Sequence, residues 1–179
     1  MNAPNLLSLV RILFTFFFIL AVYHDRFDYA LYLFVLQGLT DMLDGFLARV
    51  MKKKTELGAY LDPIADKTML LAAFIMLSIK EIIPLWFPAT IILKDVAIAI
   101  GFFILYRLVG HIKPVPSIFG KLSTTLQIAM VVFILLTEIF PLSNARPYAE
   151  VLIFATAFVT VIAGLHYILC LCCILRHDR

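Results

Sequence analysis

Six apolar stretches of about 20 residues recur along the chain, and their length constrains the fold more than any other feature. A helix needs about 20 apolar residues to cross roughly 30 Å of hydrocarbon. Inside lipid every backbone amide and carbonyl must be hydrogen-bonded within the protein, so such stretches fold as helices. The stretches are Leu6–Tyr23, Tyr29–Ala48, Ala59–Ile79, Leu85–Tyr106, Ile118–Phe140 and Ala149–Leu175. We therefore expect an all-α integral membrane bundle of six transmembrane helices.

Composition supports an integral membrane protein over a soluble one. Of the 179 residues, 63% are hydrophobic and 15% are charged, and the mean hydropathy is +1.01. Soluble domains carry roughly 25% charged residues. The connections between the apolar stretches are short, so we expect a single membrane domain over residues 1–179. No small-residue cleavage site follows the first stretch, so we do not expect a removable signal peptide.

Basic residues predict the orientation in the membrane, because cytoplasmic connections carry an excess of Lys and Arg. One side carries nine of them: Arg49, Lys52, Lys53, Lys54, Arg107, Lys113, Lys121, Arg176 and Arg179. The opposite side carries three: Arg26, Lys80 and Arg146. We therefore expect both termini to face the cytoplasm. The net charge of +3 reflects this asymmetry and does not indicate nucleic-acid binding.

Four aspartates lie at the ends of the second and third apolar stretches. Asp41 and Asp44 are spaced i,i+3, and Asp62 and Asp66 are spaced i,i+4, so each pair shares one face of a helix. Carboxylates near lipid are costly, so a group of four indicates a functional site. Carboxylate oxygens are the hard ligands that Mg²⁺ and Mn²⁺ prefer. The sequence therefore predicts a divalent-metal site held by these four residues, which we call the aspartate quartet.

The spacing D-x2-D-G-x2-A-R-x8-G-x3-D-x3-D runs without a departure from Asp41 to Asp66. It is similar to the signature of the CDP-alcohol phosphotransferases, membrane enzymes of phospholipid synthesis. The six expected helices and the opening at Asn2–Asn5 extend the resemblance over most of the chain. It implies transfer of a phosphatidyl group from CDP-diacylglycerol to an alcohol, with release of CMP. It also implies a homodimer. We expect a prokaryotic inner membrane, with the site facing the cytoplasm as the Lys and Arg distribution indicates.

The resemblance implies roles for the residues of this segment. Two Mg²⁺ or Mn²⁺ ions would clamp the diphosphate during an in-line displacement. Asp66 would be a metal ligand that also accepts the proton of the attacking hydroxyl. Gly45, Ala48 and Gly58 would let the cytidine lie against the helix backbones, and Arg49 would bind the phosphates. Close helix packing at Gly45 and Ala48 is a compatible alternative.

The second substrate is predicted from the fourth and fifth apolar stretches. Ser117–Gln127 resembles the S-x-x-G-K-x-K-T-x-x-Q segment of phosphatidylglycerophosphate synthases. Their acceptor, glycerol 3-phosphate, bears a phosphate and needs nearby cations, for which Lys94, Arg107 and Lys121 are the candidates. We therefore expect glycerol 3-phosphate as the acceptor.

Two departures favour an alternative acceptor. Ser123 replaces the second Lys of the segment, and Lys94-Asp95 stands where the glycerophosphate branch has Arg-Glu. Both departures resemble cardiolipin synthases of the same fold, which use phosphatidylglycerol. A more remote interpretation is a cation or proton transporter, since aspartates inside membranes also mark ion paths. The sequence shows no repeat of the kind that many transporters contain.

Overall fold

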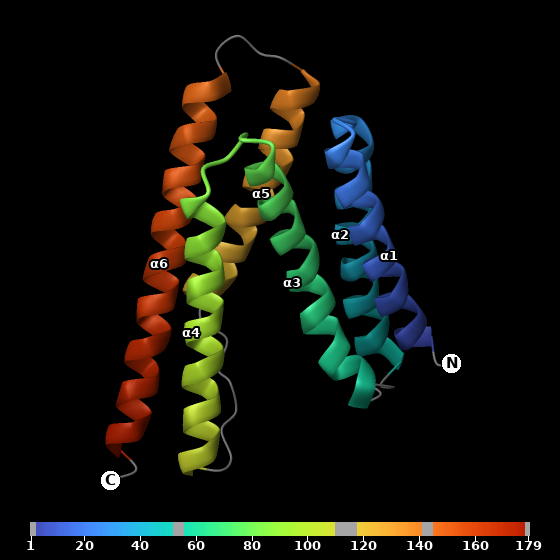
Figure 1. The fold of residues 1–179 in the computed structure, drawn as a ribbon. Helices are drawn as coiled ribbons and strands as arrows, with labels where there is room; N and C mark the ends of the chain where they lie inside the picture. The colour runs from blue at the N-terminus through green and yellow to red at the C-terminus, as the bar shows by residue number, and fades with distance from the viewer. Residues whose placement is uncertain (1–2, 52–55, 110–117, 141–144, 178–179) are drawn as a thin grey trace. The chain divides into compact units, whose positions relative to one another are not determined.

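The computed structural model of the protein describes the backbone of residues 3–51, 56–109, 118–140 and 145–177. Side chains are described at residues 10–40, 67–101, 103, 107, 118–140 and 145–170. Within these ranges the chain forms six helices and no strand (Figure 1): α1 (Ala3–Tyr23), α2 (Phe27–Met51), α3 (Glu56–Ile79), α4 (Trp86–Val109), α5 (Ile118–Ile139) and α6 (Ala145–His177). Each helix corresponds to one of the predicted apolar stretches, to within one residue where it is shorter than the stretch, and the all-α prediction is confirmed for the described residues.

The chain packs as two compact units. The first contains Met1–Ile83 and Val131–Ser143, and therefore holds α1, α2, α3 and the end of α5. The second contains Pro84–Met130 and Asn144–Arg179, and therefore holds α4, the start of α5 and α6.

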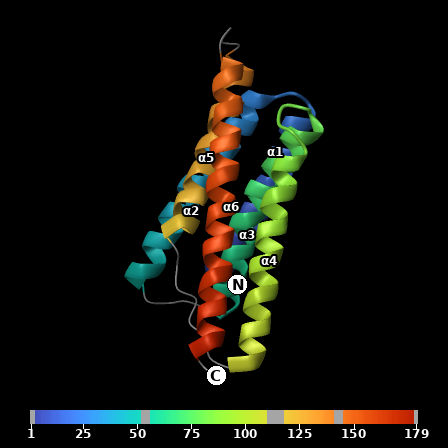
Figure 2. The ribbon, with the colours of Figure 1, turned by 90° about the vertical axis from the view of Figure 1, so that its left-hand side faces the viewer.

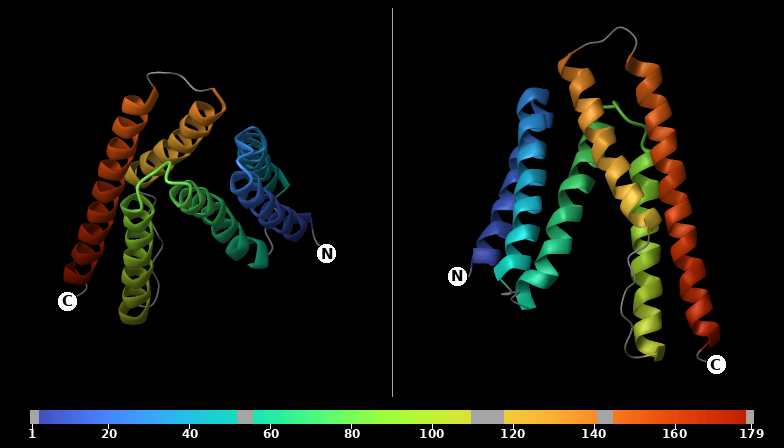
Figure 3. Two further views of the ribbon diagram at one scale, coloured as in Figure 1. Left: turned by 45° about the horizontal axis from the view of Figure 1, so that its top comes forward. Right: turned by 180° about the vertical axis from the view of Figure 1, so that it is seen from behind.

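In the first unit, α1 packs against both α2 and α3 (Figure 3). Its buried stripe consists of Arg11, Thr15, Phe18 and Val22, at most 5% exposed and spaced by four, three and four residues. This spacing keeps side chains on one face of a helix. The ring of Phe18 lies 6.0 Å from the ring of Phe34 on α2, between centroids, so the packed faces of these helices meet here.

The helices of the first unit are tied together at one end, which we call the Tyr23 end. The ammonium of Lys80, just after α3, donates a hydrogen bond of 2.8 Å to the carbonyl of Tyr23 and pairs with the Asp25 carboxylate. That carbonyl belongs to the last turn of α1, and the carbonyls of a last turn have no hydrogen-bond partner within the helix. Beside the tie, Arg26 donates hydrogen bonds to the exposed Asp28 carboxylate, and these hold the Asp28 pKa below its usual value.

In the second unit, α4 and α6 run side by side in the same direction (Figure 2). The rings of Trp86 and Phe154 stack with 5.4 Å between their centroids. This contact joins the first turn of α4 to α6. Phe87, the next residue of α4, is fully buried. Pro147 lies in the first turn of α6, where its missing amide hydrogen breaks no helical bond. Helix α6 begins at Ala145, four residues before the start of the predicted apolar stretch at Ala149.

Two helical segments of the described residues have both the length and the apolarity of a membrane span, Ile118–Ile139 and Ala145–Cys170. Shorter apolar helical segments are Val10–Tyr23 and Lys67–Ile79. Each of these two is a part of a longer helix whose other side chains lie outside the described residues. Six transmembrane spans therefore remain a prediction.

The turn after α3 stores backbone strain that a substitution can remove. Glu81 is exposed and has φ of 59°, and the amide of Ile82 donates to the carbonyl of Leu77 at 3.0 Å, closing the helix end. A side chain in this left-handed conformation costs about 1 kcal/mol relative to Gly. Glu81→Gly should therefore raise the free energy of unfolding by about 1 kcal/mol, measured by thermal unfolding in detergent. Glu81→Ala, which removes the charge and keeps the strain, should not; equal gains would contradict the strain.

Candidate functional site

The predicted site residues of α2 and α3 lie at the ends of these helices opposite the Tyr23 end. Asp41 and Asp44 belong to the last three turns of α2, and Asp62 and Asp66 to the first three turns of α3. The predicted CDP-lipid contacts occupy the same turns: Gly45, Ala48 and Arg49 in α2, and Gly58 in α3. The side chains at these eight positions lie outside the described residues, so their roles remain predictions.

Helical register places the quartet on faces that continue the packed faces of the first unit. On α2 the buried residues Ala30, Phe34 and Gln37 are spaced by four and three residues, and the next positions of that stripe are 41 and 44. On α3 the buried residues Met69 and Ala73 continue backwards to positions 66 and 62. Both stripes reach the quartet by the spacing of an unbroken helix.

Polar side chains occupy packed faces of α1 and α2 in this unit. Gln37 is 4% exposed, and its Oε1 has no hydrogen-bond partner among the described residues. Arg11 of α1 is 2% exposed and is the largest of the nearly fully buried side chains in the described part of the chain. A buried polar atom is costly unless it is satisfied. The buried polar side chains described in this unit thus include Arg11 and Gln37, and also Ser78 near the Tyr23 end.

Sequence reasoning missed Arg11. A cation within an apolar stretch was the signal that could have found it.

In the second unit, the predicted acceptor contact Lys94 is paired within its own helix. Its ammonium lies 3.1 Å from the carboxylate of Asp95. The Lys94 stem passes over Gly164 of α6, where an added Cβ would lie 2.9 Å from Lys94 Cγ. Gly164 therefore provides the space through which this side chain crosses α6.

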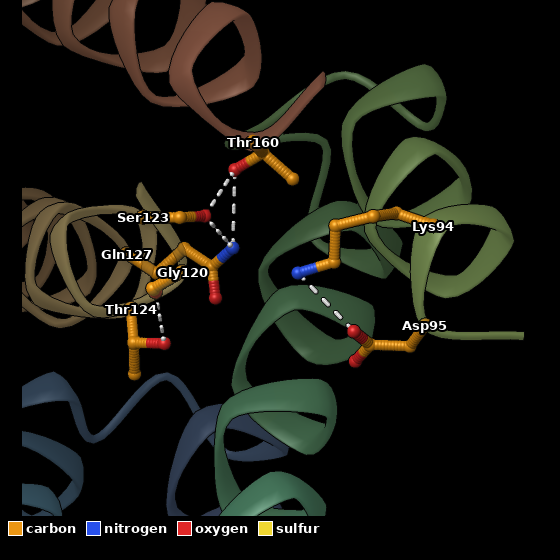
Figure 4. A network of polar contacts seen from close by, with 7 residues as sticks. All are labelled: Lys94, Asp95, Gly120, Ser123, Thr124, Gln127 and Thr160. Atoms are coloured by element: carbon orange, nitrogen blue, oxygen red, sulfur yellow. Dashed lines mark hydrogen bonds and ion pairs between the residues drawn. The ribbon is translucent and has the colours of Figure 1, made fainter. Parts of the chain in front are cut away.

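Beside this ion pair lies a neutral cluster formed by Ser123, Gln127 and Thr160, all at most 5% exposed (Figure 4). The hydroxyls of Ser123 and Thr160 are 2.8 Å apart and link α5 to α6. The Gln127 amide donates to both hydroxyls at 3.2 Å. In the view of Figure 4 the Lys94 side chain points toward this amide. The position that carries the second Lys in phosphatidylglycerophosphate synthases is thus a buried, hydrogen-bonded hydroxyl.

The other two predicted acceptor contacts are exposed. Arg107 lies in the last turn of α4, with its guanidinium 5.1 Å from the ring centroid of Phe103. Lys121 lies in the first turn of α5. The hydroxyls of Thr124 and Thr125 donate to the carbonyls of Gly120 and Lys121, so they satisfy their own helix. Contact of these cations with an acceptor remains a prediction.

Among the side chains that the structure describes, no three His, Cys, Asp or Glu residues gather to hold a metal ion. The quartet remains a predicted metal site, because its four carboxylates suit hard cations and its positions continue buried helix faces.

Comparison with known proteins places these features in a family context. The family model described as CDP-alcohol phosphatidyltransferase matches residues 1–176. The chain is 33% identical to a cardiolipin synthase (CMP-forming) of Rattus norvegicus, over 92% of this chain and 59% of that protein. The chain thus spans about three fifths of the length of this relative.

Two bacterial relatives are named for the synthesis of phosphatidylglycerophosphate or for transfer to glycerol 3-phosphate. The chain is 34% identical to a probable phosphatidylglycerophosphate synthase of Mycobacterium tuberculosis (strain ATCC 25618 / H37Rv), over 93% of this chain and 80% of that protein. It is 28% identical to a CDP-diacylglycerol–glycerol-3-phosphate 3-phosphatidyltransferase of Aquifex aeolicus, over 94% of this chain and 95% of that protein. Similarity therefore extends to both predicted acceptor classes.

The close approach of Lys94 to Gly164 can be tested by substitution. Gly164→Ala should lower the free energy of unfolding by about 1–3 kcal/mol, because the new methyl group overlaps the Lys94 stem. The loss should be smaller in a Lys94→Ala background, where the stem is absent. Gly38→Ala on α2 is the matched control: nothing lies within 4 Å of its added Cβ, so it should be neutral or stabilising. Equal losses in both Lys94 backgrounds, measured by thermal unfolding, would contradict the contact.

Proposed function

Because the chain belongs to the CDP-alcohol phosphatidyltransferase family, we propose that it transfers a phosphatidyl group from CDP-diacylglycerol to an alcohol. The acceptor oxygen attacks the phosphorus attached to diacylglycerol, the bond from this phosphorus to CMP breaks, and CMP leaves with the electron pair. The observation that carries the proposal is the complete signature from Asp41 to Asp66 inside a family match that covers residues 1–176.

The quartet is the proposed holder of two divalent cations, Mg²⁺ or Mn²⁺. Four carboxylates from two helices fit such ions. Helical spacing supports the proposal, because the buried stripes of α2 and α3 continue to positions 41, 44, 62 and 66. When bound, the cations would neutralise charge that develops on the attacked and leaving phosphoryl groups.

The remaining roles fall to the chain's own residues. Asp66 accepts the proton of the attacking hydroxyl. Arg49 offers planar, paired donors to the phosphates of the nucleotide. Gly45, Ala48 and Gly58 carry almost no side chain and leave room for the cytidine.

Glycerol 3-phosphate is the proposed acceptor. Its own phosphate needs cations, and Arg107 and Lys121 lie exposed at the ends of α4 and α5 that border residues 110–117. Two of the bacterial relatives are named for phosphatidylglycerophosphate synthesis or for transfer to glycerol 3-phosphate, which supports this choice.

Phosphatidylglycerol is the second candidate acceptor, because the polar groups around Lys94 in the second unit carry little uncompensated charge. The charge of Lys94 is offset by Asp95 at 3.1 Å, and Ser123 belongs to a neutral, hydrogen-bonded cluster. A neutral glycerol headgroup suits such surroundings better than a phosphate dianion does.

Membrane topology and assembly complete the proposal. Six helices would span the membrane, with the quartet near the cytoplasmic face, as the Lys and Arg distribution predicts. The family resemblance supports a homodimer and a prokaryotic inner membrane. The surrounding lipids would supply CDP-diacylglycerol directly to the site.

Purified protein in detergent should convert CDP-diacylglycerol and glycerol 3-phosphate to a phosphatidylglycerophosphate and CMP. Lipid products are resolved after incubation with glycerol 3-phosphate, phosphatidylglycerol, inositol phosphate or serine as separate acceptors. Cardiolipin formed from phosphatidylglycerol alone would select the second candidate.

Excess chelator should stop CMP release, and Mg²⁺ or Mn²⁺ should restore it. Full turnover in chelator would exclude the metal-dependent reaction.

Asp66→Asn should lower the rate of CMP release by at least about 100-fold, because an amide cannot accept the proton of the acceptor hydroxyl. The variant should keep a thermal unfolding midpoint close to that of the unmodified protein. Asp28→Asn, an exposed carboxylate at the Tyr23 end, is the matched control and should retain turnover. Retained turnover in Asp66→Asn would remove this residue from the role of base.

A further inference from the structure

The orientation of the buried Gln127 amide follows from a count of hydrogens in the cluster that joins α5 to α6. Three contacts connect the cluster: Ser123 Oγ to Thr160 Oγ1 at 2.8 Å, and the Gln127 amide to each hydroxyl at 3.2 Å. Three contacts need three hydrogens, and the two hydroxyls supply only one each. The amide oxygen in this place would leave one contact without a hydrogen, whereas the amide nitrogen adds two. The cluster therefore holds the nitrogen of Gln127 and turns its oxygen away.

The Gln127 oxygen and the Lys94 ammonium meet on adjacent turns of α6. Thr160 accepts from the Gln127 amide, and Gly164, over which the Lys94 stem passes, lies four residues later. Residues at this spacing share one face of a helix, about 6 Å apart. Figure 4 shows the Gln127 oxygen pointing away from both hydroxyls and the Lys94 ammonium extending toward the amide. The Lys94 side chain is 17% exposed, so a ligand can reach this ammonium.

These two groups suit a hydroxyl better than a phosphate. A ligand hydroxyl can donate to the Gln127 oxygen and accept from one of the three N–H groups of Lys94. A phosphate dianion has no hydrogen to donate, and it would lie near both the Gln127 oxygen and the Asp95 carboxylate. Asp95 also offsets the charge of Lys94, at 3.1 Å from its ammonium. The chemistry of the site therefore favours the neutral hydroxyl of a polyol.

Both candidate acceptors carry such a hydroxyl in the same grouping. Glycerol 3-phosphate and the headgroup of phosphatidylglycerol each have a primary hydroxyl, which is the less hindered nucleophile, beside a secondary hydroxyl. The next carbon is joined through oxygen to phosphorus. The secondary hydroxyl is thus a feature that the two acceptors share and that the reaction does not consume.

We propose that Gln127 and Lys94 bind the secondary hydroxyl of the acceptor and thereby select a glycerol group. Ser123 and Thr160 are positioning residues, because they hold the Gln127 amide in the orientation that presents its oxygen. This inference rests on the proposed function, since it takes the alcohol acceptor as the ligand. It assigns Lys94 to a hydroxyl of the acceptor and not to its phosphate.

Removing the secondary hydroxyl from the acceptor tests the site without changing the protein. Glycerol 3-phosphate is compared with 3-hydroxypropyl phosphate, and phosphatidylglycerol with phosphatidyl-1,3-propanediol, each with CDP-diacylglycerol and detergent-purified protein. Both analogues keep the reacting hydroxyl and the phosphate. For the acceptor that the protein uses, kcat/KM of CMP release should be about tenfold higher than for its analogue, because the analogue leaves the polar groups of the site unpaired. The pair that is turned over identifies the source of the glycerol group.

Variants of the two contacting residues should lose this discrimination. Gln127→Leu and Lys94→Gln should each reduce the ratio of kcat/KM between acceptor and analogue to about threefold or less, because a hydroxyl that has lost a partner contributes less. If Lys94 bound the phosphate instead, Lys94→Gln would slow both members of a pair equally and leave their ratio unchanged.

A pair of matched variants tests the positioning role of Thr160. Thr160→Val removes a hydroxyl that holds the amide, so it should raise the KM of the acceptor and lower the ratio, with a smaller effect on kcat. Thr156→Val makes the same change one turn earlier on α6, at a buried hydroxyl that has no hydrogen-bond partner among the described residues, and should keep the ratio. A purely structural role of Thr160 would reduce the amount of active protein, and the ratio does not depend on that amount.

Equal kcat/KM for acceptor and analogue in the unmodified protein, or an unchanged ratio in Gln127→Leu, would overturn the inference. The proposed function survives either result, because CMP is still released. Absence of CMP release by the unmodified protein with all four acceptors would instead reject the proposed function, and the inference with it.

Discussion

The cost of burying charge and hydrogen-bonding groups inside apolar helix faces is the constraint on which this structure depends. Helices satisfy their own backbones, so apolar stretches present no difficulty, but each polar side chain on a packed face needs a partner. The first unit places Arg11 and Gln37 on such faces. These faces lead by register to the positions of the four aspartates.

The opposite end of that unit sets the relative depth of its helices. Lys80 closes the last turn of α1 through the carbonyl of Tyr23, although the two residues are 57 positions apart. Such a tie fixes the level of α3 against α1, while the short turn at His24–Arg26 fixes the level of α2. With those levels fixed, the distance of each polar residue from the Tyr23 end follows from the helical rise alone.

The second unit treats its polar groups differently. Lys94 is paired with the adjacent Asp95, and Ser123, Gln127 and Thr160 satisfy one another across α5 and α6. Relatives named for the two acceptor classes share 33% and 34% identity with this chain, so overall similarity does not separate the acceptors. The charge on the acceptor-side residues is therefore the more informative property, because a phosphate dianion and a neutral glycerol headgroup differ mainly in charge.

The sequence by itself determined the helices, the family and the positions of the quartet, because apolar length and residue spacing along one helix are local properties. It also identified Lys94-Asp95 as a departure from the glycerophosphate branch. The sequence did not reveal the burial of Arg11, the passage of the Lys94 stem over Gly164 or the bond between Ser123 and Thr160. Only the tertiary structure decided these features, since each depends on which faces of separate helices meet, and no spacing within a single helix contains that information.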